Sequence, residues 1–163
     1  MLYYFFVYFK YIWYHICSYI NNLYFMGFLD WIDLLSDLSK EEKENLEMFC
    51  QEKVVPAWEV IFHEQDYATA MYILKKGSVE VTRTIEWWKV ILWEVYSEEV
   101  LWEMAMFWDR NKRMATATAL TDCTLIVILS FSIKELTSKH PKLLEKFQQI
   151  INDRMISNKN KIN

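Results

Sequence analysis

The chain has 163 residues, of which 53% are hydrophobic and 25% are charged, and its formal net charge is −4. This size and composition are typical of one globular domain and exclude an intrinsically disordered chain. The acidic balance and the lack of a basic run argue against nucleic-acid binding through phosphate contacts.

The cysteines and histidines suggest neither a disulfide framework nor a metal site. The three cysteines, Cys17, Cys50 and Cys123, are odd in number and widely spaced, and the three histidines are equally scattered. We therefore expect reduced thiols in a cytoplasmic protein and no bound metal. No spacing of Ser, His and Asp or of Cys and His indicates a nucleophilic enzyme.

Residues 1–25 differ from the rest of the chain, because they are rich in Tyr, Phe, Ile and Asn and contain no acidic residue. Their length suits a membrane span, but Lys10 and His15 interrupt the middle, and tyrosines are typical of membrane interfaces. Two interpretations stay open: a membrane anchor, or upstream sequence translated ahead of a true start at Met26. We favour the second, which leaves one domain at residues 26–163 and expects membrane association only if residues 1–25 are genuine.

The first helix signal after this segment is Ser39-Lys40-Glu41-Glu42, which has the form of a capping box. It predicts a helix with Leu46, Phe49 and Cys50 on its apolar face and a helical region that ends at Pro56. Short runs of alternating apolar and polar residues follow, which predict seven or eight strands separated by turns. These runs are residues 59–65, 70–85, 89–95, 115–120 and 123–130.

Two helices are predicted at the end of the chain. A second capping box at Ser132 to Glu135 indicates a short helix, and Pro141 suits the first turn of a longer one. The longer helix carries an apolar stripe at 3.6-residue spacing, made of Leu143, Leu144, Phe147, Ile150, Ile151 and Met155. Together the elements predict a mainly β fold with flanking helices, an antiparallel β-roll of the jelly-roll or double-stranded β-helix kind.

Two motifs connect this fold to a known family. Residues 71–81, MYILKKGSVEV, place Gly77 between two strands, and residues 101–119 read LWEMAMFWDRNKRMATATA. The first resembles a hairpin, and the second the phosphate-binding cassette (Phe-Gly-Glu-Leu-Ala-Leu, a short insert, then Arg-Ala-Ala-Thr), of the cyclic nucleotide-binding domains of bacterial transcription regulators, protein-kinase regulatory subunits and gated channels. The resemblance covers residues 33–156 and implies a β-roll closed by a C-terminal lid helix.

The resemblance also implies how a ligand would bind. Arg113 would hold the cyclic phosphate through charge-assisted hydrogen bonds, backbone N–H groups of the cassette would favour the anion, and Glu103 would accept a hydrogen bond from the ribose 2′-hydroxyl. The alternative is that Arg113 and Glu103 are solvated surface charges. The predicted ligand-binding residues are Trp102, Glu103, Met104, Ala105, Arg113, Met114 and Ala115.

We therefore predict a stand-alone regulatory module that is not an enzyme and that binds cAMP or cGMP. In the family a Thr after the phosphate Arg goes with guanine and an Ala with adenine; Met114 is neither, and we favour cAMP slightly. Signalling would pass through the C-terminal helix to an unidentified protein partner or to a homodimer formed by Leu143–Met155. The alternative is a degenerate β-roll that binds no ligand and serves as an interaction or dimerisation module.

Six tryptophans stand where the family favours glycine: Trp58, Trp87, Trp88, Trp93, Trp102 and Trp108. The chain has 8 Trp but only 2 Gly, whereas glycine makes up about 7% of an average protein. Trp is disfavoured at positive φ, which the Trp87-Trp88 turn would ordinarily reach with a glycine pair. We hypothesise that UGA codons, read as Gly by some bacterial lineages, were translated as Trp; engineering and natural degeneration are the alternatives. A genuine Trp102 would block the approach to a sugar-phosphate, and a glycine would leave it open.

Overall fold

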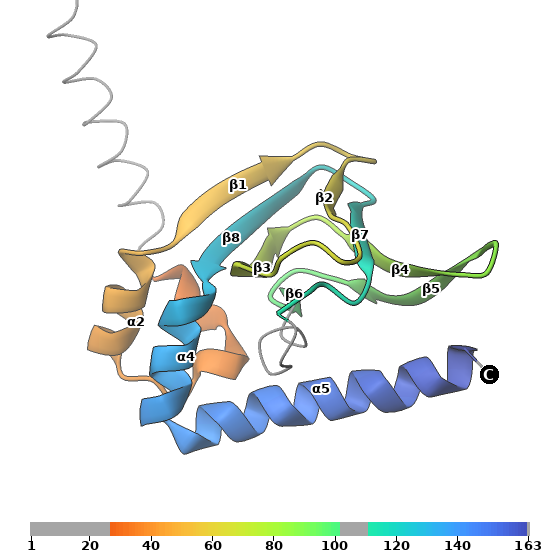
Figure 1. Cartoon of the computed structure of the whole chain (residues 1–163). Helices are drawn as coiled ribbons and strands as arrows, with labels where there is room; N and C mark the ends of the chain where they lie inside the picture. Colours follow the sequence, from red (N-terminus) through yellow and green to blue (C-terminus); the bar gives the residue numbers. More distant parts are fainter. Residues whose placement is uncertain (1–26, 102–110, 163) are drawn as a thin grey trace, which may run out of the picture.

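The computed structural model describes residues 27–101 and 111–162 (Figure 1). Within these ranges, eight strands form two four-stranded antiparallel sheets, and helices flank them. The strands are β1 (Gln51–Val55), β2 (Val60–Phe62), β3 (Ala70–Lys76), β4 (Val79–Ile85), β5 (Trp88–Val95), β6 (Val100–Leu101), β7 (Thr116–Ala119) and β8 (Cys123–Leu129). The helices are η1 (Phe28–Trp31), η2 (Asp33–Leu35), α2 (Lys40–Glu47), α4 (Ser130–Lys139) and α5 (Pro141–Ile162). The predicted β-roll with flanking helices is confirmed.

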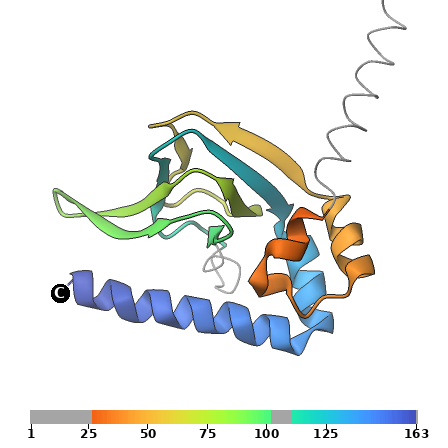
Figure 2. The same ribbon diagram turned by 180° about the vertical axis from the view of Figure 1, so that it is seen from behind.

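The core lies between the two sheets. The first sheet has the order β1-β8-β3-β6 and the second the order β2-β7-β4-β5. Met71 and Ile73 of β3 and Leu125 and Ile126 of β8 have no exposed surface. Helix α5 runs alongside the roll in two opposite views (Figures 1 and 2), and its Phe147 is buried in the same cluster. The first half of the apolar stripe on α5, with Leu143 and Phe147, is therefore part of the core.

Gly77 lies at the corner between β3 and β4. The predicted hairpin is wrong, because β3 pairs with β6 and β8, whereas β4 pairs with β5 and β7 in the other sheet. Gly77 has a φ of +102°, and a Cβ there would lie 2.7 Å from both the Asp122 carbonyl oxygen and Cys123 Sγ. A second corner of the chain thus packs directly on this backbone, which only glycine permits.

The predicted capping box opens α2 as expected. Ser39 Oγ accepts a hydrogen bond from the Glu42 N–H at 3.3 Å, and Glu42 Oε2 accepts one from the Ser39 N–H at 2.9 Å. The predicted apolar face is wrong beyond Leu46, because the helix ends at Glu47 and Phe49 is 58% exposed beyond that end. Cys50 also follows the helix.

Glu47 is a buried carboxylate that the sequence did not single out. Its oxygens accept hydrogen bonds of 3.0 Å from the backbone N–H groups of Gly27 and Leu29. These N–H groups belong to the start of η1, where no intrahelical partner is available. One acidic side chain therefore attaches the first described turn of the chain to α2.

Strand β1 occupies residues that the sequence assigned to the helical region before Pro56. All five residues pair with β8, from Gln51 opposite Val127 to Val55 opposite Cys123. Four of the five are exposed, so β1 shows no apolar alternation that would identify a strand. Its backbone pairing with a buried strand is what forms it.

The two C-terminal helices differ in how well they were predicted. Helix α4 begins at Ser130 with Leu129 as its N-cap and without a side-chain cap, so the predicted capping box at Ser132 is wrong. Ser132 instead lies buried in the first turn. Helix α5 begins at Pro141 as predicted, because proline fits the first helical position.

No helix in the described part of the chain is long and apolar enough to cross a membrane. Residues 1–25 and the proposed start at Met26 lie outside the described residues. The membrane-anchor and upstream-sequence interpretations both stay predictions.

Candidate functional site

Much of the predicted cassette lies outside the described residues, and mainly its C-terminal part is described. Strand β6 ends at Leu101, and the described chain resumes at Asn111. Trp102, Glu103, Met104, Ala105 and Trp108 lie outside the described residues, and their roles stay predictions. Arg113, Met114 and Ala115 are described, and they lead directly into β7.

Arg113 is almost completely buried, with 2% of its surface exposed. The view of this residue as a solvated surface charge is therefore wrong. Its Nη2 donates a 3.0 Å hydrogen bond to the carbonyl oxygen of Ala70 in β3. Its Cζ lies 4.1 Å from the ring centroid of Phe62 and 5.2 Å from that of Tyr72. A cation held between two rings and a carbonyl is an ordered group inside the roll.

Burial also changes the acid–base behaviour of Arg113. Desolvation lowers the pKa of its guanidinium to about 10, while Tyr72 and Asp66 act in the opposite direction. The group still carries its full positive charge at neutral pH. A desolvated cation is a strong partner for an anion, because fewer water dipoles screen the attraction.

Backbone hydrogen bonds hold the segment around Arg113 in place. Its N–H donates to the Asp66 carbonyl at 2.9 Å, and its carbonyl accepts from the Gln65 N–H at 2.9 Å. The Ala68 N–H donates to the Asn111 carbonyl at the same distance. Ala115 is buried and Met114 is half-buried. The turn at residues 63–68 therefore fixes the end of the cassette.

Phe62, Ala70 and Tyr72 are the site residues that sequence reasoning missed. Phe62 and Tyr72 stack on each other with 6.0 Å between their ring centroids, and both contact the guanidinium of Arg113. They come from different sheets, β2 and β3. Their alternation marks them only as strand residues, so no local signal connects them to Arg113.

Helix α5 reaches the strand that enters the cassette. Leu143, Phe147 and Ile151 are buried along one side of the helix. Further along, Arg154 Nη2 donates a 3.0 Å hydrogen bond to the carbonyl oxygen of Val100 in β6. The Arg154 guanidinium also lies 5.2 Å from the Trp93 ring. The last helix thus contacts the roll beside the predicted ligand site.

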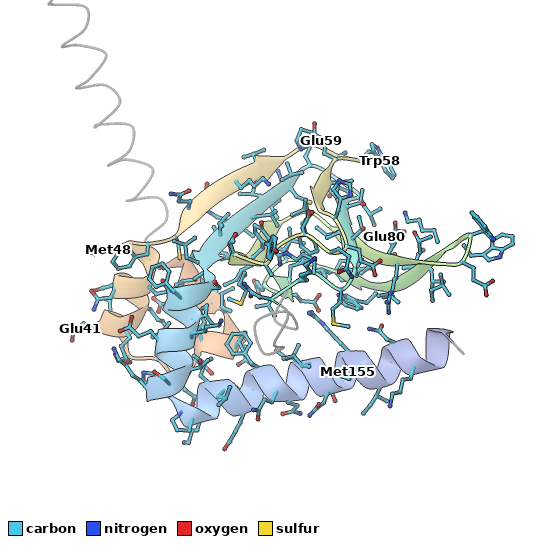
Figure 3. The ribbon with its side chains drawn as sticks, in the orientation of Figure 1. Glu41, Met48, Trp58, Glu59, Glu80 and Met155 are labelled. Atoms are coloured by element: carbon cyan, nitrogen blue, oxygen red, sulfur yellow. The ribbon has the colours of Figure 1, made fainter. Side chains whose placement is uncertain are left out.

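The tryptophans in question occupy different backbone conformations. Trp58 has a φ of +70° at the third position of the turn from Pro56 to Glu59, and its side chain is 75% exposed (Figure 3). Trp87 and Trp88 are 92% and 74% exposed, as expected for a hairpin tip. The positive φ at that tip belongs to Glu86, at +55°, so the prediction that the two tryptophans adopt it is wrong.

Trp93 is an ordinary strand residue opposite Val81, next to a β-bulge. Its ring packs partly against the core, and its buried Nε1 has no hydrogen-bond partner among the described residues. Of the four described positions, Trp58 alone has the backbone conformation that favours glycine. Trp102 and Trp108 fall outside the described residues.

Comparison with known proteins shows the family of the chain. Residues 52–140, more than half of the chain, match the family described as "Cyclic nucleotide-binding domain". The chain belongs to this family. The cyclic nucleotide-binding domain family is regulatory rather than catalytic. No curated protein matches the sequence significantly.

Three solved structures illustrate the likeness. The catabolite activator protein of Thermus thermophilus is 22% identical with a TM-score of 0.67, and the match covers 79% of this chain and 61% of that one. A cAMP-bound PfPKA-R is 30% identical with a TM-score of 0.59, covering 68% and 40%. The regulatory subunit of a cAMP-independent protein kinase A from Trypanosoma brucei is 19% identical with a TM-score of 0.70, covering 78% and 47%. The match spans less than two thirds of each of these chains.

Proposed function

We propose that this cyclic nucleotide-binding domain binds cAMP or cGMP at the cassette and passes the signal through α5. The observation that carries the proposal is Arg113, a buried guanidinium at the end of the cassette, inside the domain that the family match covers. A cyclic phosphodiester has one negative charge and two free oxygens, which suits a fork of N–H donors.

The surroundings of Arg113 support binding of an anion. The guanidinium is held against the Phe62 and Tyr72 rings and donates to the Ala70 carbonyl, so its position inside the roll is fixed. A bound phosphate would place a negative charge beside the guanidinium and so offset part of the cost of desolvating it. Glu103, with Ala105 and neighbouring N–H groups, would complete the contacts to the ribose and the phosphate.

A slight preference for cAMP over cGMP is a separate part of the proposal. Met114 follows Arg113 where the family places Thr or Ala, and it favours cAMP only slightly. Among the structural relatives, PfPKA-R is bound to cAMP, whereas the Trypanosoma brucei subunit belongs to a cAMP-independent kinase. Both cAMP and cGMP therefore need to be measured.

We further propose that ligand binding changes how α5 packs and so alters a surface for a partner. A ligand that contacts one arrangement of the helix better than another shifts the population toward it. The first half of the stripe is buried in the roll, whereas Ile156 near the end of α5 is 63% exposed. This later part of the helix is the proposed surface for a second copy or another regulatory partner.

Calorimetric titration of the full chain with cAMP and with cGMP tests the proposal. Arg113→Ala should weaken binding about 100-fold or more, because a buried charge-assisted interaction is lost, and Arg113→Lys should bind at intermediate strength. Arg83→Ala is the matched control, since Arg83 is a half-exposed arginine paired with Glu64 on the surface. The titrations are repeated with Trp102→Gly. If no binding is seen with Trp at position 102 and none with Gly, the proposal is contradicted.

A further inference from the structure

We infer that Arg154 is a positioning residue that ties the lid helix α5 to the strand entering the cassette and thereby slows release of the bound nucleotide. The inference rests on the proposed function. Arg154 is not placed in contact with the ligand; it acts through Val100, which lies two residues before the cassette position Trp102.

The bond from Arg154 reaches the part of the roll that leads to the ligand site. Its Nη2 donates to the carbonyl oxygen of Val100 at 3.0 Å, and Val100 is only 4% exposed. Strand β6 has just two residues, Val100 and Leu101, so the carbonyl that Arg154 holds lies directly before the predicted cassette in the sequence. An ionic donor to a buried carbonyl makes one of the stronger hydrogen bonds in a protein.

Arg113 and Arg154 are attached to neighbouring strands. Arg113 donates to Ala70 of β3 and lies beside the Tyr72 ring, whereas Arg154 donates to Val100 of β6. Strands β3 and β6 pair directly, with Tyr72 opposite Leu101. A shift of Arg113 toward a bound phosphate would therefore alter the position of β3 and, through its pairing, of β6, to which Arg154 is attached.

Two basic side chains attach α5 at different points along its length. Lys146 pairs with Asp37 at 2.7 Å and donates to Ser36 Oγ at 2.8 Å, which attaches the first half of the helix to the N-terminal turns. Arg154 attaches the second half, eight residues and about 12 Å further along. Loss of the Arg154 attachment would leave the first half of the helix held by Lys146 and weaken the attachment of the second half, which packs beside β5.

The inference does not depend on which residue occupies position 93. The Trp93 ring lies 5.2 Å from the Arg154 guanidinium and adds a cation–π contact. If the residue is glycine, this contact is lost, but the bond to the Val100 carbonyl uses backbone and remains available. The Trp93→Gly variant should therefore have a smaller effect than removal of Arg154.

The experiment compares Arg154→Met with the wild-type full chain by stopped-flow release of a fluorescent cAMP analogue. Lys159→Met is the matched control, because Lys159 is an exposed cation on the same helix. Arg154→Met should release the analogue about tenfold faster, the effect of losing one hydrogen bond to a charged group, while the association rate changes less than about twofold. Arg154→Lys should restore slow release in part. A residue needed only for folding would instead reduce the fraction of active protein without changing the release rate.

Amide hydrogen exchange without nucleotide provides a second readout. Arg154→Met should speed exchange in the second half of α5 and leave β3 and β8 unchanged. Release rates and exchange equal to those of Lys159→Met would overturn the inference. If neither the wild-type chain nor the Trp102→Gly variant binds the analogue, the proposed function fails, and the exchange measurement still decides whether Arg154 holds α5 to the roll.

Discussion

Position 58 allows a test of whether the backbone conformation there favours glycine over a residue with a side chain. Trp58 has a φ of +70° and its side chain is 75% exposed, so it combines an unfavourable backbone with little burial. Trp58→Gly and Trp58→Ala remove the same indole, and the difference between them isolates the backbone. A Cβ in the left-handed region costs roughly 1–2 kcal/mol, and glycine loses about 0.5–1 kcal/mol more than alanine in chain entropy on folding.

These magnitudes predict that Trp58→Gly is more stable than Trp58→Ala by about 0.5–1 kcal/mol. Trp87 is the matched control, because it is 92% exposed and does not have a positive φ. There the order should reverse, with alanine more stable than glycine by about 0.5–1 kcal/mol. The difference in the free energy of unfolding between the glycine and the alanine variant should thus have opposite signs at positions 58 and 87.

The assay is urea unfolding of the four variants, followed by circular dichroism and compared at equal m-values. Glycine at 58 equal to or less stable than alanine would refute the reasoning, since the strain would then be absent. The gene provides an independent check of the hypothesis on codons. TGA at codon 58 and at the other five positions supports recoding, whereas TGG at these codons, or a native protein whose mass retains all eight tryptophans, would contradict it.

Three further predictions concern other parts of the domain. Gly77→Ala should lower the free energy of unfolding by roughly 3 kcal/mol in a urea titration, because it adds a Cβ at φ +102° and 2.7 Å from two atoms. Ser39→Ala should cost about 1 kcal/mol by the same measurement, with loss of the cap on α2. Cyclic nucleotide affinity should be flat from about pH 6 to 9 and fall as the pH rises through about 10, because the phosphate binds protonated Arg113; a fall centred near pH 7 would implicate another group.

The parts of the fold that were predictable have local signals. The capping box at Ser39 depends on residues three apart, and the start of α5 at Pro141 depends on the fixed φ of proline. Strands β3 and β8 each have seven mostly apolar residues, and β8 is also rich in β-branched residues, so their composition identifies them. Strand β1 was missed because four of its five residues are exposed, without apolar alternation, and its pairing partners lie 68 to 76 residues away.

For the site, the sequence identified the order of the cassette and the position of Arg113 in it. It could not show that Arg113 is buried, because burial depends on Phe62 and Tyr72, which come from two sheets. The bond from Arg154 to Val100 was equally invisible, since it joins residues 54 positions apart. Electrostatic and packing contacts of this kind follow from the closure of the roll.

The sequence by itself determined the β-roll, the starts of α2 and α5, and the family to which the chain belongs. These features are encoded by residue type and spacing over a few neighbouring positions. The tertiary structure decided that β3 and β4 lie in different sheets, that Trp58 rather than Trp87 has the left-handed backbone, and how α5 is held beside β6. Such features depend on contacts between segments that are distant in the sequence, and local sequence patterns do not show which segments will come together.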